Sequence, residues 1–267
     1  MVRSQCADER QWFRVAERRI TGSNPKNDRT HLKVLKSKPR NLPFGDRILL
    51  RLSTARDFDG LWLGTLESDA ETIFQRVEEA LEMIRLHDPR RYQRLRRHIS
   101  RIWIRVLPGD EADFHAAAQA CELDPRFVRD ATVTVHDLAA TIVHESAHAR
   151  IDRCIPYRED LRHRIEAACR RDELAFCRRV PGSTALQEAI QDWLAGAPSK
   201  EFWSNSAFHQ RFINGTLESL RYLGVPPRLL PVVRGIHTVI CRTSQATSFY
   251  MAVEPTERKP TNRHALA

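Results

Sequence analysis

The chain has 267 residues, of which 42% are hydrophobic, so it can bury a sizeable core. No apolar run approaches the length of a membrane span, and the N-terminus lacks the apolar region of a secretory signal, which excludes a membrane protein and favours a soluble, cytoplasmic one. The net charge of +9 lies mainly in residues 1–47, where 12 Lys and Arg face 5 Asp and Glu. This basic character keeps a nucleic-acid partner open as an alternative.

In chain order, residues 1–45 are polar and basic and read as a weakly ordered N-terminal extension. Ile48–Leu52 then predicts a strand, and Leu61–Leu63 predicts another short apolar segment. A capping box at Ser68–Glu71 opens a helix that we expect to run from Asp69 to His87, before Asp88 and Pro89 stop it.

A second, basic helix follows over residues 90–98, and we interpret its charge as a solvated face because no nucleic-acid motif accompanies it. Alternating apolar residues in Arg101–Val106 predict a strand with one buried face. Phe114–Cys121 is expected to be helical, and the β-branched run Thr132–Val135 predicts a short strand.

Two helices are expected in the C-terminal half. A Thr-x-x-Gln box opens one at Thr184, and Gly196 closes it. The other spans Ala207–Leu223, although Gly215 weakens its interior. Residues 232–241 form a further apolar segment, expected to be helical, and residues 243–267 read as a polar tail.

Strands that precede a run of helices favour a mainly helical α+β fold, with a small sheet over one wall of a cleft. We expect residues 46–242 to form a single domain. The six cysteines contain no C-x-x-C pair, which argues against a four-cysteine zinc site and favours packed, reduced thiols.

The most informative stretch is His144–His148, which reads H-E-S-A-H. Positions i and i+4 of a helix share one face, so His144 and His148 can reach one metal ion while Glu145 points at a water beside it. Between Leu138 and Ala149 the chain carries a single charged residue, Glu145. A helix so poor in charge is expected to be buried, and a metal site would compensate the buried carboxylate. The alternative is a buried helix whose histidines bond to backbone and whose glutamate meets an arginine.

A catalytic zinc ion takes three protein ligands and one open position, so a third ligand is required. Residues 157–176 are expected to form the returning helix. Glu166 lies on it at a level comparable with His148, on the border of an apolar stripe that includes Cys169.

With Glu166, the chain resembles the gluzincin class of zinc metallopeptidases, in which H-E-x-x-H is completed by a glutamate on the next helix. The likeness covers about 45 residues and is closest to uncharacterised bacterial metallopeptidases. It implies a zincin-like fold, with Zn²⁺ bound by His144, His148 and Glu166 and with Glu145 as general base. The chain departs from the class at Arg150, where an apolar residue is usual, and at Arg170, where an acidic residue often sits.

Three other residues compete with Glu166 for the third ligand position: Glu173, Glu159 and His163. His163 would give a three-histidine site similar to that of SprT-like proteases, which act on proteins bound to DNA. The oxyanion of a tetrahedral intermediate would need a further Tyr or His, and the candidates are Tyr157, His209, Tyr222 and His237.

The sequence therefore predicts a zinc-dependent metallopeptidase that acts on a peptide or protein substrate. Two alternatives remain, a basic nucleic-acid-associated protein with an incidental H-E-x-x-H and a metal-binding protein without turnover.

Overall fold

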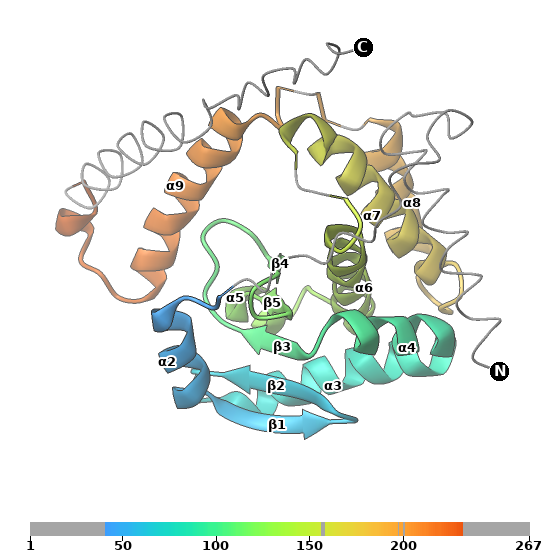
Figure 1. Ribbon diagram of the computed structural model, residues 1–267, viewed down its shortest axis with the longest axis horizontal. Helices are drawn as coiled ribbons and strands as arrows, with labels where there is room; N and C mark the ends of the chain where they lie inside the picture. The colour runs from blue at the N-terminus through green and yellow to red at the C-terminus, as the bar shows by residue number, and fades with distance from the viewer. Residues whose placement is uncertain (1–40, 156–157, 197, 200, 232–267) are drawn as a thin grey trace, which may run out of the picture.

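A computed structural model describes residues 41–231, except 156–157, 197 and 200. It confirms an α+β architecture that is mainly helical, with a small sheet in the first half and helices in the second (Figure 1). Of the extension expected over residues 1–45, residues 1–40 lie outside the described residues, and so do the apolar segment 232–241 and the tail 243–267. The last two residues of that extension, Phe44 and Gly45, belong to a helix.

The sheet has five strands in the order β1-β2-β3-β5-β4. Its strands are β1 (Thr54–Phe58), β2 (Leu61–Thr65), β3 (Arg101–Ile104), β4 (Ala112–His115) and β5 (Ala120–Leu123). Strands β2, β3 and β5 run parallel, whereas β1 and β4 are antiparallel to their neighbours. Strand β4 is therefore an antiparallel edge strand, and it packs against helix α6.

The helices in the described part of the chain are α2 (Phe44–Leu52), α3 (Ala70–His87), α4 (Pro89–His98), α5 (Pro125–Arg129), α6 (Val135–Asp152), α7 (Arg162–Cys177), α8 (Thr184–Ala195) and α9 (Asn205–Tyr222). Short 3-10 turns occupy Glu159–Leu161 and Pro227–Leu229. The helices predicted near residues 69–87, 90–98, 184–196 and 207–223 are confirmed within a few residues. The motif helix and the returning helix are α6 and α7.

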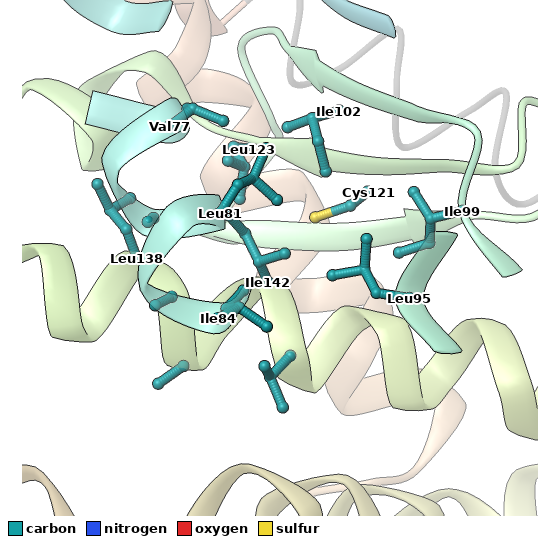
Figure 2. Close-up of a cluster of buried hydrophobic side chains, with 14 of the residues drawn as sticks. Val77, Leu81, Ile84, Leu95, Ile99, Ile102, Cys121, Leu123, Leu138 and Ile142 are labelled. Carbon is teal, nitrogen blue, oxygen red and sulfur yellow. The ribbon is translucent and has the colours of Figure 1, made fainter. Parts of the chain in front are cut away.

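The main hydrophobic core lies where α3 and α6 pack against each other and against the sheet (Figure 2). Its labelled members come from α3, from the α4 end, from β3 and β5, and from α6: Val77, Leu81, Ile84, Leu95, Ile99, Ile102, Cys121, Leu123, Leu138 and Ile142. Full burial of one such aliphatic side chain stabilises the fold by about 1.5–3 kcal/mol. The core therefore fixes one face of α6 against the sheet and leaves the opposite face for α7.

The strand predicted at Ile48–Leu52 is wrong, because this segment is the C-terminal part of helix α2. Pro43 precedes the helix, and Leu49 and Leu50 pack against Trp103 beneath the sheet. Since α2 covers that side, β3 is buried on both faces rather than on the one face expected.

The helix predicted at Phe114–Cys121 is also wrong, because β4 and β5 form a hairpin there. His115 pairs with Ala120, and Gln119 takes a positive φ of 48° to close the turn. A connection this short leaves no room for a helical turn between the paired strands.

Two helix starts differ from the sequence patterns. Thr132–Val135 is not a strand, because Thr134 is the N-cap of α6 and exchanges hydrogen bonds with Asp137 in a capping box. The box predicted at Ser68–Glu71 does not form, because α3 starts after Asp69, whose carboxylate pairs with Arg129.

Gly215 lies inside an unbroken α9, and the structure explains its presence. A Cβ atom at this position would lie 2.2 Å from the backbone of Gly109. Only glycine lets the helix backbone approach the loop after β3 so closely.

Candidate metal centre

The two histidines of the motif lie on the face of α6 that meets α7. Most of the 18 residues of α6 are buried, including His144 and Glu145. Helix α7 packs along α6 and brings Glu166, Cys169 and Glu173 to the same side. The local helix spacing thus aligns the histidines, and the packing of α7 supplies their partners.

Three donor groups converge at the centre of this interface. The Nε2 atoms of His144 and His148 lie 3.1 Å apart. The two carboxylate oxygens of Glu166 each lie 3.4 Å from one of these nitrogens, Oε2 from His144 and Oε1 from His148. A tetrahedral zinc ion with ligands at about 2.0–2.1 Å keeps its donor atoms about 3.3–3.4 Å apart. The distances between neighbouring donor atoms are therefore close to those around a zinc ion, with one oxygen of Glu166 next to each histidine.

The charges in this cluster are tightly linked. Burial by itself lowers the pKa of His144, but hydrogen bonds to Glu166 and Glu173 outweigh it and raise the pKa to about 10. Burial raises the pKa of Glu166, but the positive charge of His148 and contacts with both histidines outweigh it and lower the pKa. Neighbouring negative groups thus raise the pKa of both histidines, and a cation could take the place of a proton among them.

Glu173 contacts His144 on the side of the ring that faces away from the other donor atoms, so it is not placed to share a metal ion with them. Its Oε2 lies 3.1 Å from Nδ1 of His144, the ring nitrogen that faces away from His148 and Glu166. A carboxylate at this nitrogen fixes the orientation of the ring and makes the other nitrogen a better donor. Arg170 holds Glu173 in turn, through contacts of 3.1 and 2.9 Å to its two oxygens. The arginine that departs from the gluzincin pattern thus supports the carboxylate that orients His144.

Cys169 is the site residue that sequence reasoning missed. Its sulfur and a ring nitrogen of each of His144 and His148 all lie within 4.8 Å of one another, and the negative charge of a Cys169 thiolate would raise the pKa of His148. In the sequence this cysteine belongs to the apolar stripe of α7, and it is fully buried. Its position three residues after Glu166 was the available signal, because i and i+3 share a helix face. We refer to His144, His148, Glu166 and Cys169 as the donor cluster.

Glu145 lies beside the donor cluster but does not join it. Burial raises the pKa of its carboxyl group. The positive charges of His148 and His144 lower this pKa, and the negative charges of Asp113 and Glu166 raise it, so that the net shift is upward. Within the described ranges, the carboxylate of Glu145 has no side-chain hydrogen bond or ion pair. A buried carboxylate with a raised pKa and no fixed partner is suited to proton transfer.

The two remaining ligand candidates are Glu159 and His163. Glu159 accepts hydrogen bonds from the backbone and side chain of Asn205, at 2.6 and 2.7 Å, at the start of α9. Within the described part of the chain, the group of converging metal-ligand atoms consists of His144, His148 and Cys169, and it includes neither His163 nor Glu166.

Among the oxyanion candidates, Tyr222 accepts a hydrogen bond from Arg129 and donates one to Glu67. Its hydroxyl is therefore used in a network around α5. His209 lies half-buried on α9. Tyr157 and His237 lie outside the described residues.

Arg150, the other departure from the gluzincin pattern, has a separate role. Its guanidinium is buried and lies 3.0 Å from Asp172 on α7, and Asp172 also pairs with Arg91 at 2.8 Å. The carboxylate of Asp88 accepts a hydrogen bond from the guanidinium of Arg91 on α4. We call Arg91, Arg150, Asp88 and Asp172 the arginine cluster.

No protein-family model, no curated protein and no solved structure matches this chain. Within the described part of the chain, none of the helices combines the length and the apolar character needed to cross a bilayer.

Proposed function

We propose that the chain is a zinc-dependent hydrolase that cleaves peptide bonds, with the metal held by His144, His148 and Glu166. The observation that carries this proposal is the position of the Glu166 carboxylate opposite the two imidazoles. Their Nε2 atoms lie 3.1 Å apart, and each lies 3.4 Å from a different oxygen of that carboxylate. Two imidazoles and a carboxylate are a donor set that suits zinc, and three protein ligands leave one position open.

Zinc in such a site supplies a water of low pKa and polarises the carbonyl group of a substrate. The protein must then handle the protons. Glu145 is buried next to the histidines and has a raised pKa, so it can accept a proton from the attacking water and deliver it to the leaving amine. Glu173 keeps the ring of His144 in the orientation that directs Nε2 toward the metal position.

The arrangement of β4 supports an extended peptide as substrate. This strand is at the edge of the sheet, runs antiparallel to β5 and packs against α6, which carries the motif. An edge strand can pair with a peptide in extended conformation through backbone hydrogen bonds. A sheet of this kind ahead of the motif helix also supports the zincin-like fold and the gluzincin likeness indicated by the sequence.

The experiment is a comparison of wild type with Glu145→Gln. Purified wild-type protein should contain about one zinc per chain. The variant should keep that zinc content, because Glu145 is not a ligand, while its rate on a peptide library falls by about 10²–10⁴-fold, the usual contribution of a general base. Glu188→Gln, on an exposed position of α8, is the matched control and should behave as wild type.

Two results would contradict the proposal. Folded protein that takes up no zinc would rule out the metal centre. Zinc-loaded protein that hydrolyses no peptide would point to the alternative of a metal-binding protein without turnover, which the nearby Cys169 also favours.

The nucleic-acid alternative depends mainly on residues outside the described ranges. In the basic helix α4, Arg91 belongs to the arginine cluster and Arg96 pairs with Asp59 at 3.0 Å, so part of its charge is used within the fold. Salt-sensitive DNA binding that survives removal of residues 1–45 would favour this alternative.

A further inference from the structure

The most unusual member of the donor cluster is the thiol of Cys169. It lies on α7 one turn after Glu166, so both side chains project from the same helix face toward α6. Its sulfur lies within 4.8 Å of a ring nitrogen of each histidine. A thiol that only filled the apolar stripe would not need to approach two metal-binding nitrogens.

The chemistry of this position is that of a metal ligand. Cysteine binds zinc as the thiolate, at about 2.3 Å, and combinations of sulfur and imidazole donors are common at zinc sites. The thiol is fully buried, so bulk water does not solvate it. Binding of a cation at the centre of the cluster would release the thiol proton.

We propose that Cys169 is a fourth protein donor to the bound ion, and that it competes with water for the position left open by His144, His148 and Glu166. This inference rests on the proposed metal site and adds a means of regulating it. With the thiolate bound, the ion has four protein ligands, as in structural zinc sites. With the thiolate displaced, the position is free for water and hydrolysis can proceed.

Cobalt substitution tests the inference without a measurement of turnover. Co²⁺ replaces zinc in tetrahedral sites, and a bound thiolate adds an intense sulfur-to-metal absorption in the near ultraviolet. Full-length wild-type protein titrated with Co²⁺ should show this band. Cys169→Ser and Cys169→Ala should bind Co²⁺ without it, and circular dichroism should show that both variants remain folded.

Cys177 provides the matched control, because it is also buried on α7 but packs in the main core. Cys177→Ser should keep the thiolate band. Loss of a residue that only supports a metal ligand weakens metal binding by about 10–100-fold. Because Cys169 is proposed as a ligand itself, the zinc affinity of Cys169→Ser should fall by at least this factor. Wild type should also release about one more proton per zinc than Cys169→Ser, because a thiol loses its proton on binding.

The possible failures are distinguishable. Wild-type protein that binds Co²⁺ with no thiolate band would overturn the role of Cys169 and leave the site of His144, His148 and Glu166 intact. A thiolate band that persists in both Cys169 variants would have the same meaning. Wild-type protein that binds no Co²⁺ or Zn²⁺ would overturn this inference together with the proposed function.

Discussion

Two clusters of buried charged groups link α6 to α7, and they differ in what their protons can do. The arginine cluster pairs Arg150 and Arg91 with Asp172 at 3.0 and 2.8 Å. Arginine keeps its proton at any ordinary pH, so each cation already lies next to a carboxylate that balances its charge. This cluster can connect helices, but it offers no exchangeable position.

The donor cluster uses the same two helices differently. Imidazole gives up its proton near neutral pH when its surroundings allow, and each ring nitrogen can then bind a metal. Here two Nε2 atoms face each other at 3.1 Å, so they can share a proton, or both can bind a cation that lies to one side of the line between them. The comparison shows that burial and ion pairing alone do not identify a functional site. A functional site is instead identified by the convergence of groups that can exchange a proton for a metal ion.

Removal of Asp172 should produce the largest effect of the predictions that test this comparison. Asp172→Asn leaves the buried guanidiniums of Arg150 and Arg91 without their shared carboxylate. Loss of one partner of a buried ion pair destabilises a protein by about 3–5 kcal/mol. Urea unfolding should show this decrease, while the zinc content of the folded variant stays at that of wild type. A stable variant that loses zinc would mean that the two clusters are not separate.

Glu173→Gln should produce a smaller effect, and on metal affinity rather than on folding. The amide keeps the size of the side chain but weakens the contact at 3.1 Å that orients His144. Outer partners of metal ligands contribute about 10–100-fold to affinity, so zinc should bind more weakly by that factor in a competition titration with a chelator. His148→Gln is the reference for loss of a ligand and should bind more weakly still. Zinc affinity unchanged in Glu173→Gln would show that Glu173 does not orient the ring.

The smallest effect is expected where an ion pair is exposed. Arg158 and Asp160 pair at 2.6 Å, but both side chains are 61% exposed. Solvent screening limits such pairs to at most about 1 kcal/mol, so Asp160→Asn should barely change the urea midpoint. A large change there would undermine the use of burial to separate the arginine cluster from surface pairs.

Several elements could be predicted because their signals are local. Helices α3, α8 and α9 have long apolar periodicities or clear end signals, and they form within a few residues of the predicted bounds. The errors fall on short segments. Phe44–Leu52 and Ala112–Leu123 are apolar runs that can form either a helix or a strand, and packing against Trp103 or pairing in a hairpin decides between them.

The sequence by itself determined the paired histidines and their adjacent glutamate. Spacing of four residues on a helix directs His144 and His148 to one side regardless of the surrounding fold, because helix geometry is local. The charge-poor run around Glu145 also predicted its burial, which the structure confirms.

Only the tertiary structure assigned roles along the returning helix. Glu166, Cys169 and Glu173 lie on one face of α7 at spacings of three, four and seven residues, so sequence periodicity treats them as equivalent. The packing of α7 against α6 places Glu166 next to both Nε2 atoms, Glu173 at Nδ1 of His144 and the thiol of Cys169 beside His148. Which atom of a ring a side chain meets depends on the rotation and depth of the neighbouring helix, and the sequence of that helix does not encode these quantities locally.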